Sequence, residues 1–171
     1  MKYVTIASDI SNHPKTKTTT WACYIRHEGG VIKRSGQFKK YYSCPPRAES
    51  YALMNALAIA EKEVPSWSES KVTIHNEIEY VLDPITTKHG NVKKKDKDRA
   101  EAIRTVAIPI LEKALSWERR KIKAHYERWE TSENPAKYAI NRWCDQEANR
   151  LMKQIRTNHY DKIKLEQSAC V

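Results

Sequence analysis

Hydrophobic and polar positions give the first part of the chain the pattern of β-strands. Residues 2–8 form a β-branched run with little polar interruption, which is typical of a strand covered on both faces. Two more predicted strands follow, and Glu28-Gly29-Gly30 between them is a hairpin turn signal. We therefore predict that three antiparallel strands open the fold. They span 2–8, 19–27 and 31–38, with a polar turn over 10–18.

The rest of the chain alternates helical periodicity with short apolar runs. Apolar residues at helical spacing predict a helix over 47–63, which Pro65 ends. A second helix is predicted over 99–117, and Pro109 within it is expected to bend it. The other predicted elements are strands over 71–75 and 122–126, a short helix over 78–82, a last helix over 141–155, and a loosely held C-terminal tail over 156–171.

This order of elements predicts a mixed α/β fold. A strand followed by a helix and another strand favours parallel pairing, because the helix carries the chain back across the face of the sheet. The length of 171 residues suits one domain. We therefore expect one α/β domain over residues 1–155, built on a five-stranded mixed sheet. Three antiparallel strands come first and two parallel strands follow, with helices on both faces.

The composition indicates a basic protein with an anionic partner. Lys and Arg total 31 against 21 acidic residues, and the formal charge of +10 favours a polyanion such as nucleic acid through counterion release. The four cysteines include no C-x-x-C pair, and no apolar run resembles a signal peptide or a membrane span. We therefore expect free thiols, a cytoplasmic location and no membrane association. Zinc-binding spacing and a glycine-rich phosphate loop are both absent from the sequence.

Four acidic residues stand where an α/β domain gathers functional side chains. Asp9 and Glu77 each follow a predicted strand. Glu49 and Asp145 are each expected in the first turn of a helix, where the helix dipole favours a carboxylate. Strand ends open the crevice in which such sheets bind ligands, so these carboxylates are expected to meet there. Four clustered carboxylates repel one another unless cations neutralise them, and oxygen ligands select Mg²⁺ or Mn²⁺. Two such ions about 4 Å apart support phosphodiester hydrolysis.

At these residues the chain resembles the type 1 ribonuclease H family. Five short stretches occur in the family's order and approximate spacing over residues 1–155, which is nearly the whole chain. They are Asp9-Ile10-Ser11, Glu49-x-x-Ala52-x-x-x-Ala56-Leu57, Ile74-His75-Asn76-Glu77-Ile78-Glu79-Tyr80-Val81, Lys123-Ala124-His125 and Asn141-x-x-Cys144-Asp145-x-x-Ala148. The resemblance implies an RNase H-like three-layer fold.

The resemblance also implies the activity of a ribonuclease H, a metal-dependent endoribonuclease that cleaves the RNA strand of RNA–DNA hybrids. Two Mg²⁺ or Mn²⁺ ions would be held by the family's D-E-D-D set of carboxylates. In this sequence the metal ligands, which are also catalytic residues, fall on Asp9, Glu49, Glu77 and Asp145. A fifth catalytic position, that of a mobile histidine thought to assist proton transfer or product release, falls on His125.

Substrate contacts are implied at two further places. The basic segment 88–99 occupies the position of the protrusion with which some members grip the hybrid, although charge runs are also common on ordinary solvated loops. The candidate substrate-binding residues are Lys93, Lys94 and Lys95 in that segment and Asn12 near the N-terminus. We expect the chain to act as a monomer.

Two alternatives remain open at the level of the sequence. Glu77 stands where the family has an aspartate, one methylene shorter, and several positions that would contact the hybrid also differ. The same fold could therefore carry a DNA nuclease or junction resolvase. It could also be a non-catalytic nucleic-acid-binding module with a decayed metal site, and turnover distinguishes that module from either enzyme.

Overall fold

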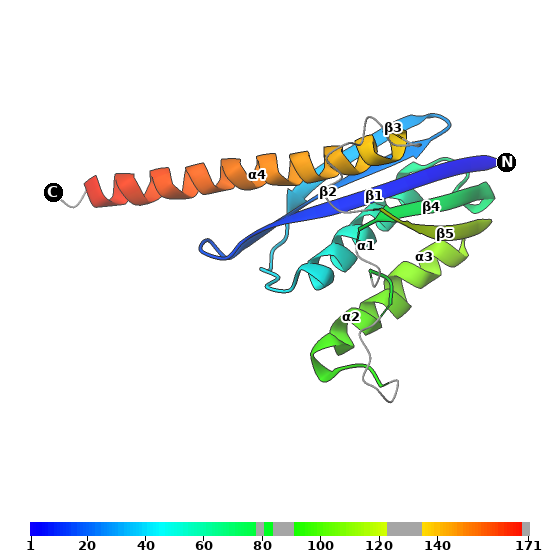
Figure 1. Cartoon of the computed structure of the whole chain (residues 1–171), viewed down its shortest axis with the longest axis horizontal. Coiled ribbons are helices and arrows are strands. Elements are labelled where there is room, and N and C mark those ends of the chain that lie inside the picture. The colour runs from blue at the N-terminus through cyan, green and yellow to red at the C-terminus, as the bar shows by residue number, and fades with distance from the viewer. Residues whose placement is uncertain (78–80, 84–90, 123–134, 169–171) are drawn as a thin grey trace.

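The computed structural model describes residues 1–77, 81–83, 91–122 and 135–168. Its centre is a five-stranded sheet in the order β3-β2-β1-β4-β5 (Figure 1). The strands are β1 (Lys2–His13), β2 (Thr18–His27), β3 (Gly30–Gln37), β4 (Ser70–Asn76) and β5 (Ser116–Lys121). The first three pair antiparallel, whereas β4 runs parallel to both β1 and β5. The predicted five-stranded mixed sheet is therefore confirmed.

Helices cover both faces of the sheet, as predicted (Figure 1). One face carries α1 (Pro45–Glu63) and α3 (Ile108–Glu112), preceded by α2 (Lys97–Ala102) further from the sheet, and the other face carries α4 (Pro135–Ser168). Shorter turns are the 3₁₀-helices η1 (Trp67–Glu69) and η2 (Lys94–Asp96) and the π-helical turn η3 (Ile103–Ala107). Within the described ranges, no helix has the length and apolar character needed to cross a membrane.

The two faces are packed with side chains of different size. The α1 face holds the large core, with residues such as Ile6, Leu57 and Ile74 fully buried. The fully buried residues of the α4 face are small. They are Ala7 and Ala22 on the sheet and Cys144 and Ala148 on the helix, all 0% exposed, and the larger Ile140, Tyr24 and Trp143 pack around them. Small side chains allow close approach, and the Cys144 thiol lies 3.5 Å from the Ala7 carbonyl oxygen. The sheet therefore holds α4 tightly over β1 and β2.

The first strand is longer than predicted. β1 continues through Asp9 to His13, and these residues pair with β2 down to Thr18. The turn is confined to residues 14–17, where Lys17 has a φ of +48°. Polar side chains suit this extension because β1 pairs with β4 only as far as Ala7, so beyond that point it has a neighbour on one side alone.

The helix predicted over 99–117 is also wrong in its bounds. Helical structure begins at Lys97, widens to the π-helical turn η3 and closes with α3 at Glu112. The wide turn precedes Pro109, which has no N–H for the carbonyl four residues earlier and whose ring crowds that carbonyl. The last strand among the described residues is β5, at Ser116–Lys121, which comes before the strand predicted over 122–126. Of that predicted strand, residues 123–126 lie outside the described residues.

The last helix is much longer than predicted. α4 spans 34 residues and places Asp145 in its third turn, so the dipole argument made for a first-turn carboxylate does not apply. Glu49 is likewise one turn inside α1, since the first turn of that helix holds no acidic residue. Residues 156–168, predicted as a tail, continue α4 beyond the sheet (Figure 1). Of the short helix predicted over 78–82, residues 78–80 lie outside the described residues and 81–83 are not helical.

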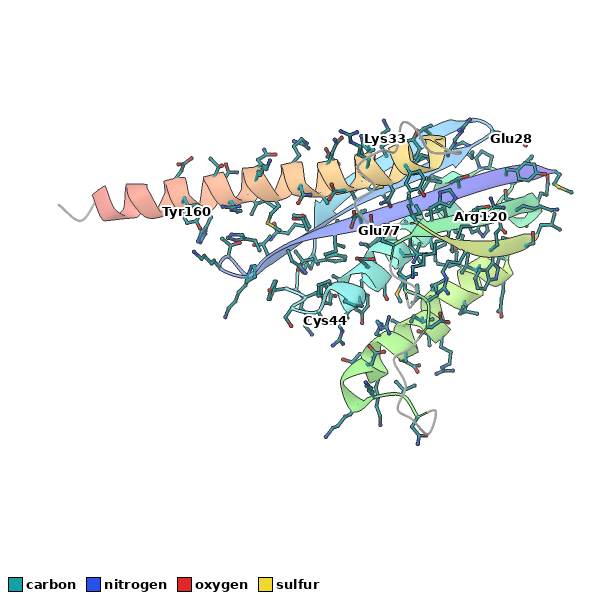
Figure 2. All side chains as sticks on the ribbon, in the orientation of Figure 1. Glu28, Lys33, Cys44, Glu77, Arg120 and Tyr160 are labelled. Atoms are coloured by element: carbon teal, nitrogen blue, oxygen red, sulfur yellow. The ribbon has the colours of Figure 1, made fainter. Side chains whose placement is uncertain are left out.

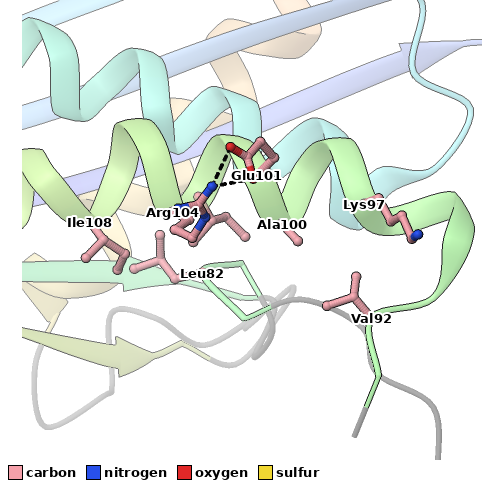
Figure 3. A pocket seen from close by; sticks show the side chains of 8 residues that line it. Leu82, Val92, Lys97, Ala100, Glu101, Arg104 and Ile108 are labelled. Atoms are coloured by element: carbon pink, nitrogen blue, oxygen red, sulfur yellow. Dashed lines mark hydrogen bonds and ion pairs between the residues drawn. The ribbon is translucent and has the colours of Figure 1, made fainter.

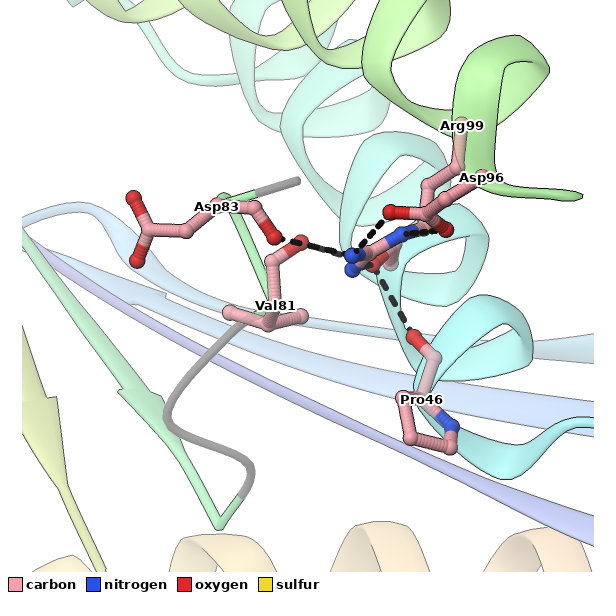
Figure 4. Close-up of polar contacts among 6 residues, drawn as sticks. Pro46, Val81, Asp83, Asp96 and Arg99 are labelled. Atoms are coloured by element: carbon pink, nitrogen blue, oxygen red, sulfur yellow. Dashed lines mark hydrogen bonds and ion pairs between the residues drawn. The ribbon is translucent and has the colours of Figure 1, made fainter. Parts of the chain in front are cut away.

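A buried guanidinium joins α2 to α1 and to the segment that follows Glu77 (Figure 4). Arg99 is 0% exposed and donates from Nε and Nη2 to the carboxylate of Asp96, at 2.8 and 2.7 Å. It also donates to the Ser50 hydroxyl at 3.0 Å and to the Asp83 carbonyl at 2.8 Å. The Ser50 hydroxyl in turn lies 2.7 Å from the Val81 carbonyl. This network therefore joins α1 and α2 to residues 81–83, which follow β4 along the chain.

Candidate active site

Four carboxylates from four elements meet at one edge of the sheet. The last pair of the β1–β4 ladder joins Ala7 to His75, so Asp9 and Glu77 come next on the two strands. The charges of Glu77 and Asp145 both act on Asp9. Those of Asp9 and Glu77 act on Glu49. Glu77 itself lies between the ribbons of α4 and α1 (Figure 2). The acids singled out from the sequence thus lie near enough for Glu49, Glu77 and Asp145 each to interact electrostatically with Asp9.

Two of these carboxyl groups have strongly raised pKa values. Burial raises the pKa of Asp9 from 3.8 to about 7; the backbone N–H of Ile10 opposes this shift, and Glu77 and Asp145 add to it. Burial also raises the pKa of Glu49 from 4.5 to about 8, with further contributions from Asp9 and Glu77. Desolvation and like charges act in the same direction here, because both penalise the ionised form. Near neutral pH, much of this pair is therefore protonated.

Side-chain amides on α4 hold two of the carboxylates. Asn141 donates through Nδ2 to Oε1 of Glu77 at 2.8 Å, and Asn149 donates to Oδ1 of Asp145 at 2.8 Å. Asn149 in turn accepts from the Ser11 hydroxyl of β1 at 2.7 Å. Neither amide was predicted to have a role. The available signal was helical spacing, since residues 141, 145 and 149 are four apart and share one face of α4.

The side chains at this site offer the type of ligand atom that a hard divalent cation prefers. All four side chains offer carboxylate oxygens, the ligands preferred by Mg²⁺ and Mn²⁺. Asn141 adds a buried amide oxygen, Oδ1, which has no hydrogen-bond partner among the described residues and could accept from a hydrated cation. As the side chains stand, however, no three His, Cys, Asp or Glu side chains in the described ranges are grouped closely enough to hold a metal ion.

Of the other predicted site residues, the structure describes the side chains of Asn12, Lys93 and Lys94. Asn12 accepts a hydrogen bond from the Thr19 hydroxyl at 2.7 Å, and Thr19 also accepts from the Tyr42 backbone, so the Asn12 oxygen supports the β1–β2 hairpin. Lys93 and Lys94 are exposed just before α2, which extends away from the sheet (Figure 1). The side chain of Lys95 and the whole of His125 lie outside the described residues.

A separate cavity of about 510 Å³ lies beside α2, η3 and α3 (Figure 3). Its lining is mainly apolar, with Leu82, Val92 and Ile108 among its residues. The exposed ion pair between Arg104 and Glu101, at 2.7 Å, lies in the same wall. None of the four acidic residues lines this cavity, so it is not part of the carboxylate site.

Comparison with solved structures identifies the fold. No protein-family model matches the chain, and no curated protein sequence is significantly similar to it. The crystal structure of ribonuclease H1 from Halobacterium salinarum NRC-1 matches 89% of this chain and 98% of its own, with a TM-score of 0.58 and 15% identity. The N-terminal ribonuclease H domain of a Mycobacterium tuberculosis protein matches over 91% and 99%, with a TM-score of 0.59 and 12% identity. A ribonuclease H1 isolated from compost matches over 89% and 99%, with a TM-score of 0.56 and 14% identity.

The chain therefore has the ribonuclease H fold. The match extends over nearly the whole length of both chains, and the strand order and pairing agree with the fold expected from the five sequence stretches. At 12–15% identity the likeness establishes the architecture, while the chemistry must be argued from the side chains of this chain.

Proposed function

We propose that this chain is a divalent-metal-dependent nuclease whose substrate is the RNA strand of an RNA–DNA hybrid. One observation supports the proposal above all others. On a ribonuclease H fold, carboxylates from β1, α1, α4 and the end of β4 interact through their charges, and burial together with these charges raises the pKa values of Asp9 and Glu49. Such a cluster is costly without a cation, and strongly perturbed groups of this kind gather at functional sites. The formal charge of +10 supports a phosphate-rich substrate.

The four acidic residues would hold two Mg²⁺ or Mn²⁺ ions. When bound, the ions supply Lewis acidity at the phosphoryl oxygen and an activated water for attack. The amides of α4 keep the ligands oriented, Asn141 for Glu77 and Asn149 for Asp145. Asp9 and Glu49 must lose their protons before they can act as ligands. Cation affinity should therefore rise with pH.

Hydrolysis would leave a 5′-phosphate and a 3′-hydroxyl. His125 would carry the proton transfer or product release that the sequence resemblance implies. The RNA strand is distinguished from DNA by its 2′-hydroxyl groups.

The test is a cleavage assay with Mn²⁺ on three labelled substrates: an RNA–DNA hybrid, a DNA duplex and a four-way DNA junction. We expect cleavage of the RNA strand of the hybrid alone, abolished by Asp9→Asn and retained by Asp161→Asn, which changes an exposed carboxylate of α4. Cleavage of the junction instead would assign the chain to the DNA nucleases. If the hybrid is cut equally well by Asp9→Asn, the proposed site is wrong.

A non-catalytic nucleic-acid-binding module is the second candidate. It is favoured by the longer Glu77 side chain and by the lack, among the described residues, of side chains already grouped around a metal position. This candidate predicts salt-dependent binding without turnover. Calorimetric titration with Mn²⁺ separates the two candidates. The enzyme requires a saturable Mn²⁺ site that Asp9→Asn weakens, whereas the non-catalytic module requires no such site.

A further inference from the structure

The C-terminal half of α4 projects beyond the sheet, and the turn between β1 and β2 reaches out beneath it (Figure 1). Described side chains along this half of the helix, from Arg156 to Asp161, are exposed. An exposed helix that buries no apolar face contributes little to folding. Its exposed side chains are therefore available for binding at the surface.

The projecting half continues the face of α4 that carries the carboxylate. Asp145 and Arg156 are 11 residues apart, which at 3.6 residues per turn is about three turns. Both side chains therefore leave the helix in nearly the same direction. Asn149 lies on this face between them and bonds to β1 through Ser11, so the face is turned toward β1. Arg156 stands about 16 Å along the helix from Asp145, at 1.5 Å per residue.

The β1–β2 turn brings more positive charge to the same place. Lys15 and Lys17 are exposed in the turn. Arg156 and His159 of α4 are near enough to act on His13 at its base, whose pKa is lowered first by lost hydration and then by Arg156, Lys15 and His159. The ring of His13 bonds through Nδ1 to the Thr16 hydroxyl at 2.8 Å, which joins the strand residue before the turn to a residue within it.

We propose that this turn and the projecting half of α4 form a backbone-binding arm, which holds a sugar-phosphate strand about five base pairs from the scissile phosphate. The spacing follows from the distance of about 16 Å along the helix, because about 3.4 Å per base pair makes this about five steps. The arm is defined by Lys15, Lys17, Arg156 and His159. It rests on the proposed function, because it takes the carboxylates as the site of cleavage. Its partner is nucleic acid because the charges lie in line with the carboxylate face.

Nearby groups do not cancel this charge. Asp161 lies five residues beyond Arg156, about 140° further around the helix, and so faces away from the arm. Arg150 also lies on a different face and is already paired with Glu147 at 2.7 Å. The exposed Tyr160, 42% accessible, flanks His159 and can contact a sugar or base (Figure 2).

The test measures binding of the full chain in EDTA to fluorescent RNA–DNA hybrids of about 6 and about 16 base pairs, at several salt concentrations, because the proposed span is about five base pairs. The arm variant is Lys15→Gln with Arg156→Gln, and the matched control is Arg26→Gln with Lys62→Gln, two exposed cations elsewhere. We expect the arm variant to lower the salt slope by about two for the longer hybrid and to leave the shorter one nearly unchanged. The control should change neither.

Each outcome has one meaning. Equal slopes for the arm variant and its control, with both folded by circular dichroism, would overturn the arm even if the hybrid is cleaved. Equal losses on both hybrid lengths would overturn the spacing from the carboxylates. Binding with the expected slope change but no cleavage in Mn²⁺ would support the arm and reject the nuclease. Preference for anionic vesicles over every nucleic acid tested would reject both.

Discussion

Asp9 and Glu49 are carboxyl groups that the fold makes difficult to ionise. Their pKa values of about 7 and about 8 exceed their usual values of 3.8 and 4.5. The folded chain therefore retains protons over a pH range in which the unfolded chain has released them. The charge of the cluster, and with it the stability of the cation-free protein, becomes a function of pH.

We expect the melting temperature in EDTA to fall as pH rises from about 5 to about 8, because stability decreases with pH wherever the folded state binds more protons. Mn²⁺ should reverse the loss, and more strongly at pH 8 than at pH 5, since cation and proton compete for the same oxygens. Thermal melts at fixed ionic strength measure this. Glu49→Gln should flatten the dependence, and a melting temperature that rises with pH in EDTA would contradict it.

Asn141 and Asn149 are expected to act as positioning residues. Removing a group that orients a metal ligand typically costs about 10–100-fold in metal affinity or activity. Asn141→Ala should therefore raise the Mn²⁺ concentration required for half-maximal cleavage by about that factor. Gln146→Ala, an exposed change on the same helix, is the control. An unchanged Mn²⁺ requirement in Asn141→Ala would assign the amide a purely structural role.

Among the contacts between elements, we expect the hydrogen-bond network of Arg99 to be the most sensitive to a single substitution. The guanidinium and the Asp96 carboxylate are both buried, at 0% and 7% side-chain exposure. Loss of one partner of such a pair costs about 3–5 kcal/mol, because the remaining charge stays in a poorly solvated place. The same network holds Val81–Asp83, so the damage should reach the end of β4.

Arg99→Met should lower the melting temperature by about 10 °C, at roughly 2–4 °C per kcal/mol for a chain of this size. Arg104→Met is the matched control. Its ion pair with Glu101 is exposed at 73% and 58% and is worth under about 1 kcal/mol. Both are measured by urea and thermal unfolding. Similar losses for the two variants would show that burial of the Arg99 pair is not what stabilises the fold.

Most of the elements that the sequence predicted well have a buried apolar face, whereas β3, which is mostly exposed, was located by the hairpin turn signal before it. β1, β2, β3, α1 and β4 were found within a few residues of their expected positions, except that β1 continues into a polar stretch. β5 could not be found in this way. Its sequence Ser-Trp-Glu-Arg-Arg-Lys is an edge strand with charged side chains and little apolar alternation. The end of α4 was missed for a related reason, since an exposed polar helix leaves no stripe to detect.

The carboxylate cluster was predicted more completely than its supports. Each acid stood beside a recognisable element, so the order of strands and helices was enough to suggest that the four would meet. The amides of Asn141 and Asn149 and the hydroxyl of Ser11 depend on how α4 is set over β1. That setting follows from contacts between small side chains in three dimensions, which spacing along one element does not encode.

The molecule as a whole is a compact sheet with one long helix extending from it (Figure 1). Removal of the residues after Ile155 should shift the melting temperature by no more than about 2 °C, because the exposed residues 156–161 bury little apolar surface. The truncated chain should cleave short hybrids normally and require lower salt for long ones. A large loss of stability would show that the projecting segment belongs to the core.

The small side chains beneath α4 have a mechanical consequence. Because α4 extends well beyond the sheet, a small change in its tilt where it contacts the sheet would displace its free C-terminal end by a larger distance. Ala7, Ala22, Cys144 and Ala148 lie in that contact, beside the turn of α4 that carries Asp145. Ala148→Leu would therefore change the tilt of α4 and move its C-terminal end more than it moves the acidic residues. A pair of spin labels, one near the acidic residues and one near the C-terminal end of α4, would measure this displacement as a change in distance.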